Sequence, residues 1–254
     1  MTRIAVPFHL HERRDDMILP LEPDVIVSDP VPTEATWGAF VPLYENVAAA
    51  VAAADRSQPP VVFTADCCVA VGVLGGLARV DIHPGVVWID GHGDFNTPDT
   101  TISGYLGGMA LSAVTGRGDV SAGDGLGVAP VPDERVVLVD ARDLDPAESE
   151  LLDASRLRRV KIEEVGSALR TALATGPIYL HVDLDVLDPA ELPGLLFPAT
   201  GGSTLGALAE ATATVAETGR LAAVSIGCTW HPAEADPARC REVVSALLDT
   251  LAGG

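Results

Sequence analysis

The sequence predicts an α/β fold in which a mostly parallel sheet carries helices on both faces. Short runs rich in β-branched residues are apolar along their whole length, which is typical of strands covered on both faces. These runs alternate with longer segments rich in alanine and leucine, the order expected when each strand is followed by a helix. We see no internal repeat and no linker, and 254 residues suffice for a large core, so we expect one domain over 1–254.

Eight segments have the strand pattern. They are RIAVPF (3–8), VIVSD (25–29), VVFTAD (61–66), VVWID (86–90), VVLVDAR (136–142), RVKIEEV (159–165), YLHVDLD (179–185) and AAVSIG (222–227). Helices are expected between them, at 34–55, 67–79, 103–116, 146–155, 165–175, 204–218 and 236–252. The last of these begins after Asp236 with Pro237 at the first helical position, where the missing N–H of proline costs nothing.

Three looser stretches, 92–105, 117–135 and 188–203, are rich in glycine, proline, aspartate and threonine. Two of them directly follow strand ends that carry acids. Because ligands bind at the carboxyl ends of the strands in open α/β sheets, we expect the chemistry to lie where these loops begin.

The chain is acidic, with 36 Asp and Glu against 16 Lys and Arg and a formal net charge of −20. It lacks the clustered basic residues that neutralise phosphates, which argues against a nucleic-acid partner. The acidity fits either an affinity for cations or a soluble surface. No run of about 18 apolar residues occurs, so we expect no membrane span.

The four cysteines, two of them adjacent, do not have the pattern of a disulfide framework in a chain of this length. We therefore expect reduced thiols and a cytoplasmic protein. The first residues, MTRIAVPFHLHERRDD, contain no long apolar region and no cleavage site, and we interpret them as a first strand rather than a signal peptide.

Acidic residues and a histidine alternate at the end of one predicted strand. Residues two apart on a strand face the same way, so Asp90, His92 and Asp94 can converge on one point, and Asp183 and Asp185 share a face at the end of another strand. Carboxylates bind hard divalent cations, and an imidazole shifts the preference towards Mn, Fe, Ni, Co or Zn. Helix caps and turns explain other acids of the chain, but not this spacing at two apolar strand ends.

Four motifs together resemble the arginase/agmatinase (ureohydrolase) family. WIDGHGDFNTPDTTISGYLGGM and HVDLDVLDP are similar to its two metal-binding signatures, FTADCCVAVG to its Gly-Gly-Asp-His segment and ARDLDPAE to its Arg-Asp-x-Asp-Pro-x-Glu segment. They occur in family order between residue 61 and about residue 200. The resemblance implies a three-layer α/β/α fold with a mainly parallel sheet of about eight strands. It also implies two Mn²⁺ ions and hydrolysis of an amidine or guanidino carbon.

The ligand set implied by the resemblance is altered at one position. Asp90 and Asp183 would bridge the two ions, and His92 and Asp185 would complete one of them. Asp94 and a histidine would complete the other, but Cys67 stands where that histidine belongs. Because a thiolate is softer than an imidazole, this second site would take a different metal, bind it weakly or stay empty, leaving one ion. The alternative for Cys67 is a small buried residue that opens a helix.

Residues that would hold the amino-acid end of a substrate are retained. By resemblance, Asn96 and Ser103 would bind an α-carboxylate, Asp145 an α-amino group, and Glu148 would support Asp145. Asp145 followed by proline is also the pattern of a helix start, and both roles can coexist.

The guanidinium end departs further from the family. Gly107 replaces a histidine thought to shuttle protons, and Cys228 or Thr229 stands where a glutamate often pairs with the guanidinium. His231 could occupy that neighbourhood or be structural. His181, two residues before Asp183, could support the metal ligands or pack within the sheet.

Our first hypothesis is a metal-dependent hydrolase of arginine or of a modified arginine such as N-hydroxy-arginine, giving a urea-type product and an amine. Asp94 would orient the attacking water and pass its proton to the leaving amine. Family members are often trimers or hexamers, so we expect a homo-oligomer. The alternative is a catalytically inactive relative with a binding or assembly role, which the changes at Cys67, Gly107 and the missing glutamate favour and the five retained ligands oppose.

Overall fold

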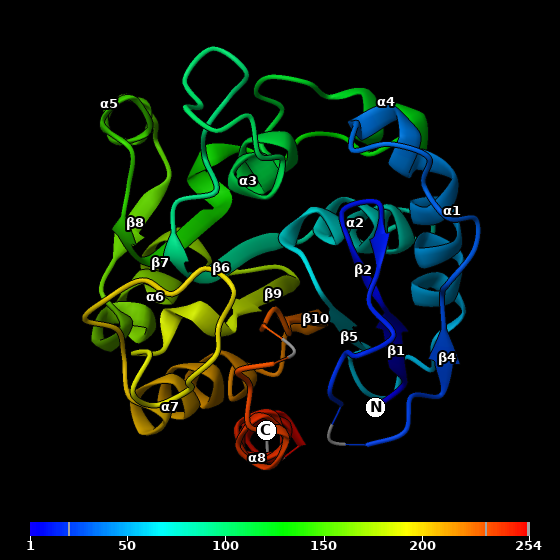
Figure 1. Ribbon diagram of the computed structural model, residues 1–254. Coiled ribbons are helices and arrows are strands. Elements are labelled where there is room, and N and C mark those ends of the chain that lie inside the picture. The colour runs from blue at the N-terminus through cyan, green and yellow to red at the C-terminus, as the bar shows by residue number, and fades with distance from the viewer. Residues whose placement is uncertain (20, 232, 253–254) are drawn as a thin grey trace.

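The protein is built around one eight-stranded sheet, shown in Figure 1, and the structure is a computed structural model that describes residues 1–19, 21–231 and 233–252. All strand pairings in this sheet are parallel, and the strand order is β4-β1-β5-β10-β9-β6-β7-β8. The strands are β1 (Arg3–Val6), β4 (Val25–Ile26), β5 (Val61–Thr64), β6 (Gly85–His92), β7 (Val136–Asp143), β8 (Arg158–Val160), β9 (Ile178–Asp183) and β10 (Leu221–Gly227). The predicted α/β fold and its parallel sheet of eight strands are confirmed.

Helices cover both faces of the sheet and form two separate apolar cores (Figure 1). Helices α1 (Trp37–Ala53), α2 (Ala70–Ala78), α3 (Ala110–Val114) and α4 (Ser121–Leu126) pack on one face. Helices α6 (Val165–Ala172), α7 (Leu205–Ala216) and α8 (Pro237–Ala252) pack on the other, while α5 (Pro146–Ala154) follows β7. Among the described residues, no helix combines the length and the apolar character that crossing a membrane requires.

The two cores explain why the strand segments are apolar throughout. On β6, Trp88 belongs to the first core while Val87 and Ile89 belong to the second, and on β5 Val62 and Phe63 divide in the same way. Successive side chains point to opposite faces, so a strand with helices on both sides buries every position.

Several element boundaries differ from those predicted. The strand predicted at 159–165 ends at Val160, because a 3-10 turn at Ile162–Glu164 leads directly into α6. The strand predicted at 179–185 ends at Asp183, and Leu184–Val186 form a second 3-10 turn. Asp183 and Asp185 therefore do not share a strand face, which corrects the prediction.

Glycine and proline account for the other differences. The first predicted strand breaks at Pro7, which has no N–H for a sheet, and Phe8–His9 (β2) instead pair antiparallel with Glu12–Arg13 (β3). The helix predicted at 103–116 is α-helical only over α3, after a 3-10 turn at Gly107–Met109. Helix α4 lies within the stretch predicted to be loose, where glycines hide the helical pattern.

The strand order brings the chemistry-bearing loops together. Five strands that are consecutive in the sheet, β5, β10, β9, β6 and β7, run parallel, so their carboxyl ends lie at the same end of the sheet. This end is where the sequence predicts the ligand site.

Candidate active site

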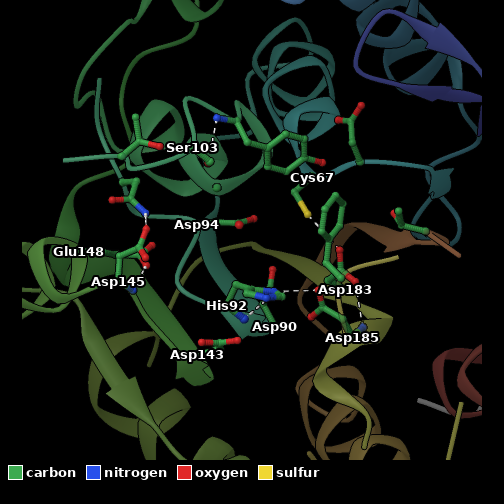
Figure 2. A pocket seen from close by; sticks show the side chains of 18 residues that line it. Cys67, Asp90, His92, Asp94, Ser103, Asp143, Asp145, Glu148, Asp183 and Asp185 are labelled. Atoms are coloured by element: carbon green, nitrogen blue, oxygen red, sulfur yellow. Dashed lines mark hydrogen bonds and ion pairs between the residues drawn. The ribbon is translucent and has the colours of Figure 1, made fainter. Parts of the chain in front are cut away.

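One cavity of about 260 Å³ lies at the carboxyl ends of these central strands (Figure 2). Acids dominate its lining, and a thiol, an imidazole, an amide, hydroxyls and two aromatic rings complete it. All ten residues that the sequence singled out line this cavity: Cys67, Asp90, His92, Asp94, Asn96, Ser103, Asp145, Glu148, Asp183 and Asp185. Their convergence is a structural finding, whereas the individual roles assigned to them stay predictions.

Asp90, His92 and Asp185 form a first group of metal-ligating side chains, with one ligand atom of each within 4.8 Å of the others. His92 Nδ1 lies 2.9 Å from Asp185 Oδ2 and 3.6 Å from Asp90 Oδ1. Asp90 Oδ1 also accepts from the backbone N–H of His92 at 2.7 Å. An irregularity in the β6–β7 pairing between Asp90 and His92 marks the point where β6 leaves the regular ladder.

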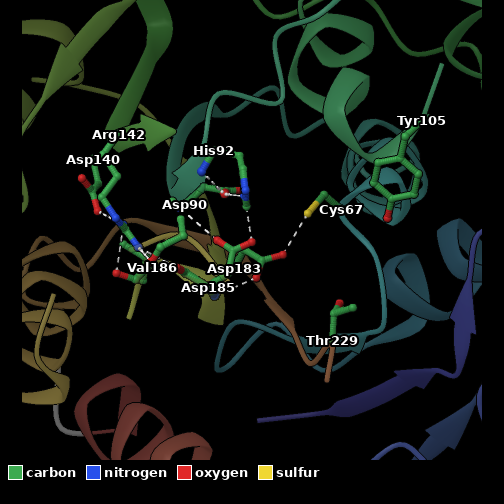
Figure 3. A network of polar contacts seen from close by, with 12 residues as sticks. Cys67, Asp90, His92, Tyr105, Asp140, Arg142, Asp183, Asp185, Val186 and Thr229 are labelled. Atoms are coloured by element: carbon green, nitrogen blue, oxygen red, sulfur yellow. Dashed lines mark hydrogen bonds and ion pairs between the residues drawn. The ribbon is translucent and has the colours of Figure 1, made fainter. Parts of the chain in front are cut away.

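A second group consists of Cys67, Asp90, His181 and Asp183, again with ligand atoms within 4.8 Å of one another. The Cys67 thiol donates to Asp183 Oδ2 at 3.1 Å (Figure 3). Asp90 belongs to both groups, as a bridging ligand would, and the Trp88 indole N–H fixes its other oxygen at 3.1 Å. The cysteine at the altered position is thus part of a candidate metal site.

Burial of these acids raises their pKa values. Burial, followed by the charge of Asp185, raises the pKa of Asp183 to about 7, and burial with the charge of Asp90 does the same for Asp185. Burial opposes protonation of His92, yet its hydrogen bonds to Asp185 and Asp90 raise its pKa to about 12. Burial and then the charge of Asp94 raise the pKa of the Cys67 thiol well above its usual value. A divalent cation would relieve this accumulation of buried acid, so the donor set fits a metal.

Asp94 lies on the cavity but outside both groups. Strand β6 ends at His92, and Asp94 has a positive φ of 48° in the loop beyond it. Asp94 Oδ2 is buried without a hydrogen-bond partner among the residues described. Burial, followed by the charge of Asp90, raises the pKa of Asp94 well above its usual value. This carboxyl is therefore directed at space that a ligand would fill.

Three of the predicted substrate-binding residues, Asn96, Asp145 and Glu148, form a connected cluster at the other side of the cavity (Figure 2), while the exposed Ser103 lines the cavity separately and accepts from the Tyr105 N–H at 3.1 Å. Glu148 is buried and accepts from the backbone N–H groups of Phe95, at 2.8 Å, and of Asp145, at 3.3 Å. Asn96 Nδ2 donates to Asp145 Oδ2 at 3.2 Å. Asp145 is also the N-cap residue of α5, with Pro146 at the first helical position, so the helix-start reading holds alongside the cavity position.

Arg142 secures the turn that carries Asp185 (Figure 3). Its guanidinium pairs with Asp140 and donates to the carbonyl oxygens of Asp185 at 3.0 Å and Val186 at 3.2 Å. It also donates to the carbonyls of Ala199, at 2.8 Å, and Thr200, at 2.9 Å. One side chain on β7 thus ties the end of the β9 turn to a distant loop.

Tyr105 was missed by the sequence analysis and fills the space beside Gly107. A Cβ atom on Gly107 would lie 2.2 Å from a ring carbon of Tyr105. The Tyr105 hydroxyl lies 2.7 Å from His9 Nε2, and Phe197 packs against the ring with centroids 5.1 Å apart. The signal in the sequence is an aromatic residue two positions before the glycine that replaces the family's histidine.

Two departures at the guanidinium end are now placed. Thr229 lines the cavity, and its hydroxyl donates to the Ala65 carbonyl at 2.7 Å, whereas Cys228, the other residue considered for the position of the missing glutamate, is buried and is not among the lining residues. His231 is exposed and is not part of the cavity lining. His181 is fully buried and packs against Trp88, with ring centroids 3.9 Å apart and the planes tilted by 33°, and burial lowers its pKa to about 3.

Comparisons with known proteins identify the family of the chain. A model of the Arginase family matches residues 21–229. The chain is 37% identical to N(omega)-hydroxy-L-arginine amidinohydrolase of Streptomyces lavendulae over 187 residues, which is 73% of this chain and 65% of the relative. It is 34% identical to the arginase of Bacillus caldovelox over 172 residues, which is 63% of this chain and 58% of that protein.

The aligned regions thus span less than two thirds of these two relatives. The solved structure of the Bacillus caldovelox arginase superimposes with a TM-score of 0.84 at 25% identity, covering 99% of this chain and 97% of that one. The chain belongs to the arginase family.

Proposed function

We propose that the protein is a metal-dependent amidinohydrolase that cleaves a C–N bond of a linear guanidino amino acid. The products are a urea-type compound and an amine. The observation that carries this proposal is the pair of ligand groups that share Asp90 in a cavity whose far side is lined by Asn96, Asp145 and Glu148. Arginine and N-hydroxy-arginine are the substrates that this arrangement supports best.

Two divalent cations, with Mn²⁺ as the first candidate, would be held by the two groups. Asp90, His92 and Asp185 would hold one, and Cys67, Asp90 and Asp183 are the residues of the second group that match the family's ligands. Asp94, which the sequence also predicts as a ligand of the second ion, lies outside that group. Bound cations supply the acidity that makes water a nucleophile near neutral pH. The protein's contribution is to hold the ligands in place, which the backbone N–H of Gly91 does for Asp185 Oδ1 at 3.0 Å.

Asp94 is the residue we assign to proton transfer. Its Oδ2 is buried and has no hydrogen-bond partner among the residues that the structure describes, and Asp94 lines the cavity next to the ligand groups, so this oxygen is free to accept a proton from the attacking water. The same oxygen would return that proton to the leaving amine, which must leave protonated.

The amino-acid end of the substrate would be oriented by the cluster around Asp145. The Asp145 carboxylate would accept from the α-ammonium group, while Asn96 and Ser103 would donate to the α-carboxylate. Glu148 holds Asp145 and the Phe95 backbone in register, so it positions this cluster from behind.

Thr229, one of the residues that would face the head group of the substrate, is neutral, although acids such as Asp66 also line the cavity. Thr229 supplies no charge for a guanidinium cation, which favours a less basic N-hydroxyguanidine over arginine. The Streptomyces lavendulae relative is named for the N-hydroxy substrate, which supports the same choice. We propose in addition that the enzyme works in the cytoplasm as a trimer or hexamer.

The test is to incubate the protein, loaded in turn with Mn²⁺, Ni²⁺, Co²⁺ or Zn²⁺, with arginine, N-hydroxy-arginine, agmatine and guanidinobutyrate. We expect urea-type product from N-hydroxy-arginine at a higher kcat/KM than from arginine. If none of these compounds is hydrolysed with any of the metals, the proposed amidinohydrolase activity is refuted. That result would favour the non-catalytic relative, which the glycine at 107 and the threonine at 229 support.

A further inference from the structure

We propose that His181 is itself a metal ligand and supplies the imidazole that position 67 has lost. Cys67, His181, Asp90 and Asp183 then form a four-ligand cation site of mixed sulfur, nitrogen and oxygen donors, suited to Zn²⁺ or Co²⁺. The inference rests on the metal centre of the proposed function, but it makes no use of turnover.

The four donors lie close together. A ring nitrogen of His181, the Cys67 sulfur and one carboxylate oxygen from each aspartate all lie within 4.8 Å of one another. The donors of one tetrahedral ion, at bond lengths of about 2.0 to 2.3 Å, lie roughly 3 to 4 Å apart, so small side-chain rotations close the site. His181 and Asp183 are two residues apart on β9 and face the same way, and β6 pairs in parallel beside them.

One ring nitrogen of His181, Nε2, makes no hydrogen bond in the described structure. Its side chain is fully buried, and Nδ1 lies 2.7 Å from Ser225 Oγ. Nε2 finds no hydrogen-bond partner anywhere in the described chain. A histidine that served only packing would leave this buried polar atom unpaired at a cost in stability. An ion beside Cys67 and Asp183 would remove that cost.

The neighbours of His181 favour the tautomer that a metal needs. The Tyr179 hydroxyl lies 2.6 Å from Ser225 Oγ, so it can donate to Ser225 while Ser225 accepts from His181 Nδ1–H. That arrangement leaves the lone pair on Nε2. Metal-ligating histidines usually donate their other ring N–H to an oxygen in this way. Trp88 packs against the ring, but its N–H already donates to Asp90.

The chemistry of the donors separates the two sites. Coordination converts the Cys67 thiol to a thiolate, and its proton leaves to solvent. A thiolate with an imidazole and two carboxylates prefers Zn²⁺ or Co²⁺, whereas His92 with Asp90 and Asp185 offers the harder set that suits Mn²⁺. The prediction is a mixed-metal centre in which Asp90 is shared.

The experiment titrates Co²⁺ into the metal-free full-length chain and follows the thiolate-to-cobalt charge-transfer band and the visible bands of four-coordinate cobalt. We expect both in the wild type, and X-ray absorption of the Zn²⁺ form should show one sulfur and at least one imidazole. Cys67→Ser removes the charge-transfer band. His181→Ala weakens the sulfur-ligated ion by about 10- to 100-fold or more, and Ser225→Ala, which removes the Nδ1 partner, by about tenfold. His83→Ala, which removes an exposed imidazole, is the control and changes nothing.

A folded His181→Ala protein that binds Co²⁺ with the affinity and spectrum of the wild type overturns the proposal. If that variant does not fold, His92→Ala keeps the test, because it removes the only imidazole of the other ligand group. Imidazole scattering from the sulfur-ligated Zn²⁺ of His92→Ala then supports His181, and its absence overturns the proposal. A chain that passes these tests but hydrolyses no guanidino compound would lose the proposed function and keep this site.

Discussion

Replacing Arg142 by lysine tests whether the metal centre depends on the turn behind it. The Arg142 guanidinium spreads its N–H groups over four backbone carbonyls, those of Asp185, Val186, Ala199 and Thr200, and pairs with Asp140. A lysine ammonium donates from a single point and cannot serve four carbonyls spread over two segments. The substitution keeps the positive charge but removes the planar set of N–H donors that reaches all four carbonyls.

The magnitude follows from the bonds that are lost. Lysine at 142 would keep the contact to Asp140 and about one carbonyl, leaving three carbonyls to find other donors. Arg142 is only slightly exposed, so water replaces these bonds in part, and we take about 1 kcal/mol for each, or roughly 3 kcal/mol in all. For a chain of this size, that loss lowers Tm by roughly 6 to 12 °C. Because the Asp185 turn loosens, metal affinity of the first group falls by about tenfold or more.

Thermal unfolding with and without Mn²⁺, together with a metal titration, measures both effects. Arg220→Lys is the matched control, because Arg220 is an arginine that donates to a single carbonyl, that of Gly176, at 2.9 Å. Its Tm should stay within the small range typical of surface substitutions, about 0.5 kcal/mol in stability. An Arg142→Lys protein as stable as Arg220→Lys, with unchanged metal affinity, would refute the role of Arg142.

Three further predictions address the cavity. Gly107→Ala places a methyl group against the Tyr105 ring, so we expect a lower kcat/KM with unchanged metal content. Gly108→Ala is the control and should behave as wild type in the same assay, because an added Cβ at Gly108 meets nothing within 4 Å. Glu148→Gln weakens the two hydrogen bonds that the Glu148 carboxylate accepts from the backbone, so KM should rise more than kcat falls, and the free energy of unfolding should drop by about 1 to 3 kcal/mol. An unchanged KM would contradict the positioning role of Glu148. In the folded protein the pKa values of Asp183 and Asp185 are raised to about 7 and that of His92 to about 12, so the metal-free protein binds more protons folded than unfolded. Its stability should therefore fall as pH rises from about 5 to 8, while the stabilisation by added Mn²⁺ should grow. A Tm of the metal-free protein that rises over this pH range would disprove the prediction.

The sheet and the place of the site could be predicted because their signals are local. Strands such as β6 bury both faces, so every residue from Val86 to Ile89 is apolar, and the acids begin where the strand reaches the open edge. The convergence of Asp90 with Asp183 then follows from parallel pairing, since neighbouring strands end at the same edge.

The remaining features depend on contacts between distant segments. Asp185 reaches the cavity from a 3-10 turn rather than from a strand face, and contacts with distant residues such as Arg142 and Gly91 hold that turn in place. The sequence also cannot tell that His181 Nδ1 meets Ser225, which lies opposite on β10, while Nε2 has no hydrogen-bond partner among the described residues. The neighbourhood of Tyr105 and His9 joins residues 96 positions apart.

Metal content per chain is the most direct test of the central claim, measured by elemental analysis after exposure to Mn²⁺ and Zn²⁺ and removal of free ions. The two ligand groups share Asp90, so the wild type should retain two ions and Asp90→Asn should lose both. A wild-type protein that retains no ion, or an Asp90→Asn variant that still holds two, would contradict the account.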